Sequence, residues 1–538
     1  MGITVMDTVS KVRTKLPVFI LLYLLAFPSF SGDWQATPRV NIDEVLTDNV
    51  ELNEFDKSSS AVTIFSPGLN INYLATGAEL DIDYSLSQAW YSHDHDLDDD
   101  FNTLKANGRL SLPINGLSLI GSASITNVSQ NTARNSLADI VSGDTVEYKN
   151  YSLGLTYNTQ SSSFSIDSKI NFILDDAQDD VGERDGYNAS FLSVSGSNSR
   201  YVFWYLNGEY TDYQNDSRDG SFYTSEIKVG YISNPKINPF IRVYDEDVSG
   251  NLNDNKIQGT SSIGVGVRWL VAEHFVVDVA YNKVDEESDS IGEVSDEQED
   301  YTSAAIEWQP SARTNIYAKY YQRFFGDAYE FNYSHRTRRL TTSVAYNESL
   351  NLFDRLELAP TNYQDVWCLS GQPQNIDNCL FSPGDDVDLS DYDFSGIYSE
   401  LELQQAESFS LNQALTLSSQ LSLNRMSLQL SLGKRKRENL ELEDYDSYDT
   451  ASFSIVRQTS RNATMTLKLS FNKNSLNNNS RYSTKQEDYY RIYSLNWQHQ
   501  LNRTLQVTYS GQHLNRASNH FGYSYEENRL SLLLVKEF

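Results

Sequence analysis

Apolar and polar residues alternate at a period of two in short stretches along almost the whole chain after Trp34. A clear example is 262–269, where Ile263, Val265, Val267 and Trp269 are interleaved with Ser262, Gly264, Gly266 and Arg268. The stretches 164–172 and 465–472 repeat the pattern. This period places apolar side chains on one face of a β-strand. It does not say which face is buried, because a soluble sandwich buries the apolar face and a membrane barrel turns it to lipid.

The connections between the expected strands differ in length in a regular way. Tight turns are expected at 75–77, 115–116, 158–162, 198–200, 234–238, 272–273, 310–314, 336–338, 422–424, 460–462 and 500–503. Longer, mostly acidic connections are expected at 48–60, 92–100, 129–144, 175–185, 247–258, 285–300, 347–404, 436–445 and 474–486. Short periplasmic turns and long outer loops are typical of outer-membrane barrels. We predict an all-β fold, a single large antiparallel transmembrane β-barrel of about 24 strands, with 22 as the alternative count.

Both ends of the chain fit export to that membrane. Residues 1–31 predict a secretory signal peptide, with Lys11, Arg13 and Lys15 before an apolar run at 16–27 that is too short to span a membrane. The barrel is then expected over 32–538. At the other end, Leu530, Leu532, Leu534 and Phe538 share one strand face. They indicate either the signal read by the barrel assembly machinery or an ordinary amphipathic end strand.

Composition narrows the class of protein. Hydrophobic residues make up only 39% of the chain, while Tyr and Phe are abundant, as suits strands that meet lipid at every second residue. The formal net charge is −31. Such a balance argues against nucleic-acid binding, which needs clustered Lys and Arg.

The two cysteines, Cys368 and Cys379, lie close together in one polar stretch. In an exported protein this spacing favours one local disulfide over two free thiols. The surrounding connection, 347–404, is the longest expected outer loop. It is either a plug that folds into the mouth of the barrel or a loop that stands outside it.

The loops offer weak candidate chemistry. Asp94, Asp96 and Asp98 come closest to a calcium loop, but Asp99 stands where an EF-hand needs glycine and Lys105 where it needs a carboxylate. The alternative is that the acidic loops are simply solvated. No metal and no cofactor is expected.

Catalysis has little support in the sequence. The best-placed histidines, His93 and His95, belong to no recognised catalytic motif, and we expect no enzymatic activity.

One basic run stands out, made of Lys434, Arg435, Lys436 and Arg437 at the outer end of an expected strand. It is either a contact with lipopolysaccharide phosphates or a charge balance against nearby glutamates.

Four short phrases carry a resemblance to a known family. They are Thr47-Asp48-Asn49-Val50, Ser66-Pro67-Gly68, Phe324-Phe325-Gly326, and Ser334-His335-Arg336-Thr337-Arg338-Arg339. Their order and spacing resemble the outer-membrane β-barrel family associated with PEP-CTERM and exosortase systems, porin-like proteins often encoded with exopolysaccharide genes. The resemblance implies a Gram-negative outer-membrane location and no catalytic residues. The basic turn at 336–339 is either a solvated hairpin turn or a contact for headgroups or a periplasmic partner.

Three functions follow, in decreasing order of support. The first is a channel or scaffold for export or assembly of surface exopolysaccharide, with the polysaccharide or its export proteins as partners. The second is a structural or receptor-like surface barrel without transport. The third is an outer-membrane enzyme. In all three, outer-membrane lipid and lipopolysaccharide surround the barrel.

Overall fold

The computed structural model describes residues 32–129, 137–177, 184–214, 219–250, 259–284, 299–370, 379–381, 389–439, 444–476, 485–520 and 522–538. The expected signal peptide, 1–31, lies outside these residues. No helix within the described ranges is long and apolar enough to cross a membrane.

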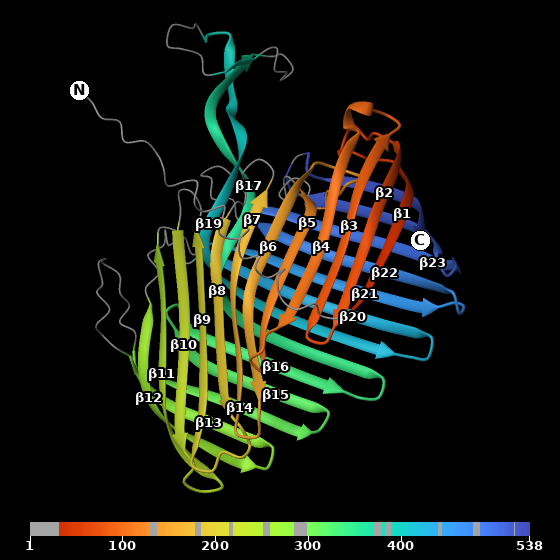
Figure 1. Ribbon diagram of the computed structural model, residues 1–538. Coiled ribbons are helices and arrows are strands. Elements are labelled where there is room, and N and C mark those ends of the chain that lie inside the picture. Colours follow the sequence, from red (N-terminus) through yellow and green to blue (C-terminus); the bar gives the residue numbers. More distant parts are fainter. Residues whose placement is uncertain are drawn as a thin grey trace, which may run out of the picture.

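The chain forms one closed antiparallel β-barrel (Figure 1). The first half contains β1 (Gly32–Thr47), β2 (Ser60–Ala75), β3 (Ala78–Tyr91), β4 (Asp99–Ser111), β5 (Leu117–Ser129), β6 (Thr145–Gln160), β7 (Phe164–Ala177), β8 (Arg184–Ser195), β9 (Val202–Gln214), β10 (Asp219–Tyr231), β11 (Ile237–Gly250) and β12 (Thr260–Ala272). The second half contains β13 (Phe275–Val284), β14 (Tyr301–Ser311), β15 (Thr314–Arg323), β16 (Gly326–Arg336), β17 (Leu340–Leu369), β19 (Tyr392–Ser422), β20 (Met426–Asn439), β21 (Asp444–Gln458), β22 (Ala463–Leu476), β23 (Gln486–Asn502), β24 (Leu505–Ser518) and β25 (Tyr525–Glu537). Each strand pairs with the next, and β1 pairs with β25, which confirms the predicted 24 strands.

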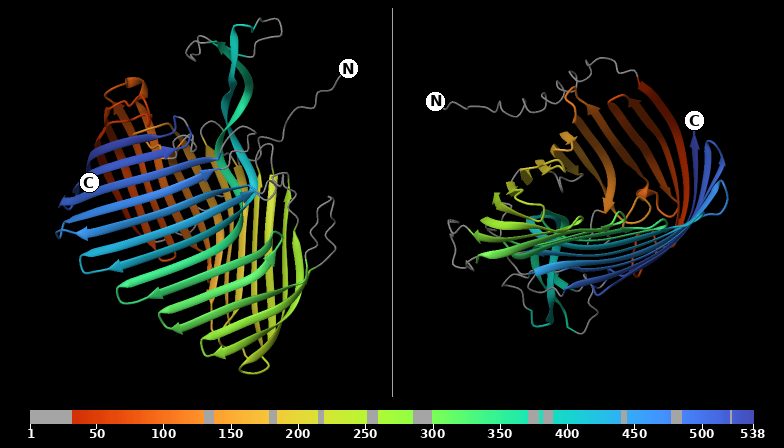
Figure 2. Two further views of the ribbon diagram at one scale, coloured as in Figure 1. Left: turned by 180° about the vertical axis from the view of Figure 1, so that it is seen from behind. Right: turned by 90° about the horizontal axis from the view of Figure 1, so that it is seen from below.

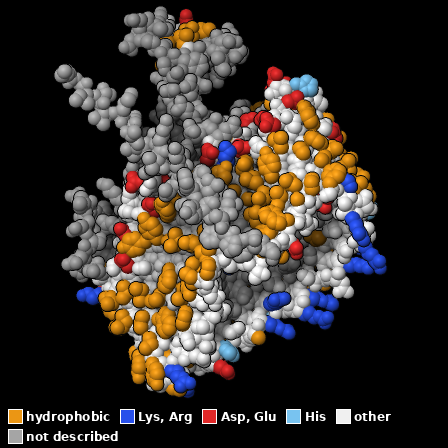
Figure 3. Space-filling view, viewed as in Figure 1, with side chains coloured by type: hydrophobic (Ala, Val, Ile, Leu, Met, Phe, Trp, Pro, Cys, Tyr) orange, Lys and Arg blue, Asp and Glu red, His pale blue; other side chains and the backbone are white. Residues whose placement is uncertain are grey.

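Apolar side chains of the strands point outward and polar side chains point inward, the reverse of the arrangement in a soluble β-protein. On β12, Ile263 and Val265 are 59% and 66% exposed on the outside, whereas Ser262 is 3% exposed and faces the lumen. Apolar side chains accordingly cover much of the visible outer surface of the strands (Figure 3). An apolar exterior around a polar interior is the arrangement that lipid requires. The chain is therefore an outer-membrane β-barrel of the Gram-negative type.

All eleven predicted tight turns join strands at the periplasmic end of the barrel. Three outer connections were not predicted: 215–218, 324–325 and 519–524. The connection at 324–325 departs most from the expected long outer loops. Arg323 pairs directly with Gly326, which leaves only two residues between β15 and β16. The outer loops are therefore not uniformly long.

The expected outer loop 347–404 is mostly strand. The ladder between β17 and β19 runs from Leu340↔Leu421 to Leu369↔Tyr392, and a short strand, β18 (Cys379–Phe381), adds to its end. The resulting ribbon rises beyond the barrel mouth rather than into it (Figure 1). This position matches the alternative of a surface loop, not the plug.

Two broad walls face each other across the lumen (Figure 2). One wall is made by the early strands up to β11, and the other by the strands from β14 onward. The chain turns from one to the other through β12 and β13. On β12 the inward residues are small, Thr260, Ser262, Gly264 and Gly266. A β-carbon at Gly264 would collide with the Asn282 side chain, and one at Gly266 with the Phe240 ring, so these glycines permit the close approach.

The seam between the first and last strands closes the barrel. Leu530, Leu532 and Leu534 of β25 share one strand face, which is turned outward, and Phe538 at the chain end is 70% exposed. The phrase 47–50 lies at the outer end of this seam. Thr47 Oγ1 donates to Glu527 at 2.6 Å, and the backbone N–H of Asn528 donates to the Asp48 carboxylate at 2.7 Å. Through Thr47 and Asp48, the first outer loop is therefore joined to the last strand.

Candidate functional site in the lumen

A column of paired charges fills the lumen where β10 and β11 face β13 to β15. The Glu226 carboxylate accepts from Arg242 Nε at 2.7 Å and from Lys319 Nζ at 2.6 Å. These side chains come from β10, β11 and β15, and Glu226 and Arg242 are almost fully buried. Since a buried charge is tolerated only when it is paired and hydrogen-bonded, the two cations hold this carboxylate in place.

The column continues toward both ends of the barrel. Toward the periplasm, Asp278 on β13 accepts from Lys228 at 2.8 Å and from Arg268 at 2.9 Å. Toward the outside, Glu246 on β11 accepts from Arg323 at 2.7 Å. Three of these ion pairs, Lys228–Asp278, Lys319–Glu226 and Arg323–Glu246, join strands that are not neighbours in the sheet.

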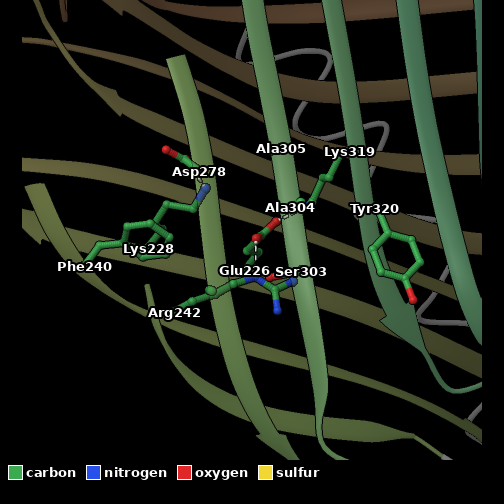
Figure 4. A pocket seen from close by; sticks show the side chains of 11 residues that line it. Glu226, Lys228, Phe240, Arg242, Asp278, Ser303, Ala304, Ala305, Lys319 and Tyr320 are labelled. Atoms are coloured by element: carbon green, nitrogen blue, oxygen red, sulfur yellow. Dashed lines mark hydrogen bonds and ion pairs between the residues drawn. The ribbon is translucent and has the colours of Figure 1, made fainter. Parts of the chain in front are cut away.

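Very little space remains between these side chains (Figure 4). The cavity enclosed by Glu226, Lys228, Arg242, Asp278 and Lys319 leaves about 10 Å³ for the centre of a water molecule. That volume is about the minimum for one buried water. A solute cannot pass through this part of the lumen without breaking ion pairs.

An apolar cluster closes the same part of the lumen near its outer end. Phe222 of β10 and Val248 of β11 pack against Leu350 of β17 and Phe409 of β19. The contact joins the two opposite walls directly.

The other part of the lumen, along β3 to β8, is polar and open to water. On β4 the inward residues Thr103, Lys105, Asn107 and Arg109 are all exposed, although they face the inside of a closed barrel. On β7, Asp167 and Lys169 are exposed in the same way. Exposed side chains on an inner wall indicate that water reaches this face.

A segment of the outer loop between β5 and β6 folds into the mouth of this open part. We call 137–144 the inner segment. Its Val141 is 8% exposed and packs against inward-facing Val45, Val62 and Ile64. The Tyr91 hydroxyl donates to the Ile140 carbonyl oxygen at 3.0 Å.

Polar contacts attach the inner segment to the last strand. The Asp139 carboxylate accepts from Arg529 Nη1 at 2.6 Å, and Ser142 Oγ donates to the buried Glu527 carboxylate at 2.7 Å. The first outer loop is attached too, because the Gly143 N–H donates to the Val50 carbonyl oxygen at 2.9 Å. The inner segment therefore caps the open part of the lumen from the outside.

Below this cap lies a polar recess of about 320 Å³ lined by Gln35, Thr37, Arg39, Asn70 and Glu537. Arg39 Nη1 donates to the Asp83 carboxylate at 2.6 Å across β2. Gly68, from the phrase 66–68, leaves room for this pair, because a β-carbon there would lie 3.0 Å from Arg39 Nε. The recess lies near the periplasmic end of the β1–β25 seam.

The predicted loop chemistry does not assemble into a site. Asp94 accepts from the Asp96 backbone N–H at 3.0 Å, and Asp98 accepts from the Tyr91 backbone N–H at 2.7 Å. These carboxylates stabilise a short 3₁₀ turn, η1 (His95–Leu97), and do not converge. Across the described ranges, no group of three or more potential ligands could hold a metal ion.

The histidine candidates lie in the same connection. His95 Nδ1 is 3.3 Å from the Asp98 carboxylate, and its side chain is 82% exposed. Neither His93 nor His95 lies on a strand. The pair is open to solvent and faces no nucleophile that the described contacts reveal.

The basic run at 434–437 divides between two faces of β20. Lys434 and Lys436 lie on the outward face with Leu430 and Leu432, near the outer rim, whereas Arg435 and Arg437 face the lumen. Arg437 pairs with Asp446, and Arg435 lies over the Tyr448 ring at 4.7 Å. Contact with lipopolysaccharide stays a prediction, and only the two lysines are placed to make it.

The other predicted residues occupy structural positions. In the phrase 334–339, His335 contacts Thr314 Oγ1 at 2.8 Å, and Thr337 Oγ1 closes the turn by accepting the Leu340 N–H at 3.0 Å. Arg336, Arg338 and Arg339 are exposed at the periplasmic end. The backbone places Cys368 directly opposite Cys379 in the β17–β18 pair, as the predicted disulfide requires.

Comparisons with known proteins assign no family and no function to the chain. No family model matches the sequence, and no curated protein matches it. Among solved structures, the chain is similar to a mutant of the ferric enterobactin receptor PfeA from Pseudomonas aeruginosa, with 11% identity, coverage of 94% of this chain and 80% of that one, and a TM-score of 0.43. The FrpB iron transporter from Neisseria meningitidis has 8% identity, coverage of 94% and 83%, and a TM-score of 0.43. Similarity at this level says nothing about a substrate.

Proposed function

We propose that the chain is a gated outer-membrane channel whose passage follows the open polar wall from β3 to β8. The observation that carries the proposal is the inner segment. It covers a water-exposed lumen face through one ion pair, three hydrogen bonds and a small apolar contact. A segment docked by so few contacts can detach and bind again.

We also propose that the channel serves the export or assembly of a surface exopolysaccharide. The support for this part is the resemblance of the phrases at 47–50, 66–68, 324–326 and 334–339 to barrels of PEP-CTERM and exosortase systems. The polar wall is compatible with a hydrated polymer. In the filled part of the lumen, the buried Tyr244 packs against the half-buried Tyr321, and the pair offers little surface on which sugars could slide.

The test is conductance of the refolded barrel in a planar bilayer, with and without added acidic and neutral polysaccharide. Asp139→Lys places a cation against Arg529 and should release the inner segment, raising single-channel conductance several-fold. Asp144→Lys makes the same charge change in the same segment at an exposed position, and should leave conductance unchanged. If the membrane is silent for all three proteins, no channel exists.

A second candidate function, a structural surface barrel, is favoured by the charge column. Paired charges that fill a lumen make the barrel rigid and leave no path for a solute. In that case Asp139→Lys would lower stability without opening a conductance.

A further inference from the structure

Basic residues gather on one half of the periplasmic rim. Five consecutive turns, from the one between β14 and β15 to the one between β23 and β24, each contain or adjoin at least one arginine. Together these arginines form the arginine arc, which consists of Arg313, Arg336, Arg338, Arg339, Arg425, Arg457, Arg461 and Arg503. All eight side chains are exposed, and Lys and Arg side chains are seen along this edge of the molecule (Figure 3).

The arc contrasts with the rest of the rim. The six turns between β2 and β13 contain only Arg200 and Lys236 as cations, together with the acid Glu273. The five turns of the arc contain no acid at all. In a chain with a net charge of −31, this segregation makes one side of the periplasmic opening basic.

The arginines are available for that partner. No ion pair joins any of the eight to an acid in the described part of the chain, whereas lumen arginines such as Arg242 and Arg323 are paired. A guanidinium group matches carboxylate and phosphate oxygens with two parallel hydrogen bonds. The expected partner therefore carries repeated carboxylates or phosphates.

The spacing of the turns indicates the shape of that partner. Neighbouring turns on one rim are two strands apart, or about 10 Å, so five turns span roughly 40 Å. A linear polyanion can contact each turn in succession. Lipid headgroups surround the whole barrel and would favour basic turns on both halves of the rim, which is not the observed distribution.

We propose that the arginine arc binds a linear polyanion, an acidic polysaccharide chain, on the periplasmic side of the barrel. The proposal deepens the channel function by naming the charge of the polymer, and rests on it for the direction of transport. The outer end fits this direction, because its loops are acidic and would repel the same polymer once it had crossed.

Binding is measured without any conductance, so that a silent channel and a failed binding site give different results. The purified barrel in phosphatidylcholine nanodiscs is titrated into fluorescent polygalacturonate, with neutral dextran as the control polymer. The five-turn variant R313Q/R338Q/R425Q/R461Q/R503Q should bind at least about tenfold more weakly, since each exposed charge contributes modestly. Salt should weaken wild-type binding in the same way.

A matched pair of variants separates the arc from general charge. R425Q/R461Q removes two cations from the arc, and R200Q/K236Q removes two from the opposite half of the rim. Only the first should lower the affinity for polygalacturonate. Equal loss in both, or no loss in the five-turn variant, overturns the proposal.

A third measurement distinguishes a lipid contact. If phosphatidylglycerol in the nanodisc abolishes polygalacturonate binding, while the five-turn variant loses thermal stability only in those discs, the arc belongs to headgroups and the proposal fails. Unchanged binding in phosphatidylglycerol discs supports the polymer.

Discussion

The two parts of the lumen are built from the same kinds of residue and behave differently. Along β3 to β8, inward Lys105, Asp167 and Lys169 are exposed to water. Where β10 and β11 face β13 to β15, inward Glu226 and Lys319 are paired and buried. Both sets follow the same two-residue alternation in sequence. The difference teaches that the curvature of the wall, not the composition of its strands, decides whether a lumen charge meets water or another charge.

The wall turns back at β12 and β13 (Figure 2). At β12 the inward side chains are so small that Asn282 and Phe240 fill the space above Gly264 and Gly266. Beside this turn of the wall, β10 and β11 come within side-chain reach of β15. The strands β3 to β8 have no such bend beside them, so their charges stay apart from the opposite wall.

The largest expected effect is the removal of a charge from the column. Glu226→Gln leaves Arg242 and Lys319 facing each other in a buried site, and should lower the free energy of unfolding by about 3–5 kcal/mol. Urea unfolding of the barrel in lipid vesicles, followed by tryptophan fluorescence, measures the change. Asp167→Asn removes a carboxylate from the open wall and should change stability by no more than about 0.5 kcal/mol. A similar loss of stability in both variants would mean that charges in the filled part and in the open part of the lumen contribute equally to stability.

A smaller effect is expected on ion selectivity, which tests whether ions follow the open wall. In the Asp139→Lys background, Lys105→Glu should raise the preference for cations by about twofold, because a charge that lines a water-filled passage biases permeation. Reversal potentials under a salt gradient give the ratio. Lys434→Glu makes the same change on the outward face and should not shift the potential. An equal shift in both variants would place the passage elsewhere or attribute the effect to surface charge.

The sequence predicts the strands and turns well because both depend on neighbouring residues. Alternation at a period of two and turn residues such as those at 76–77 or 115–116 are local signals. The number of strands and the outward face of Leu530 to Leu534 follow from them. The hairpin at 324–325 was missed because it breaks the rule of long outer loops.

The contents of the lumen could not be predicted in this way. Glu226 and Lys319 are 93 residues apart, and nothing in their neighbourhoods indicates that the walls bring them together. The sequence pattern predicts the inner segment only as part of a long, mostly acidic connection. Its signal was present in Leu137, Ile140 and Val141, an apolar group in a polar connection, but only the docked structure shows that these residues have a surface to bury against.

The smallest expected effect concerns the seam beside the inner segment, at the outer end of the open part. Partial burial acts to raise the pKa of the Asp48 carboxyl, but hydrogen bonds from Asn528 and the nearby Lys57 charge outweigh it and hold the pKa below its usual range. A carboxyl with a lowered pKa in the folded state stabilises that state above its unfolded pKa of about 3.9, and the contribution is lost as pH falls through the lower folded value. Hydrogen exchange at the Asn528 amide should therefore show less protection at acidic pH than can be explained by the intrinsic exchange rate. Asp48→Asn should abolish this additional pH dependence, and if the variant and the wild type keep the same pH profile, another group holds the seam closed.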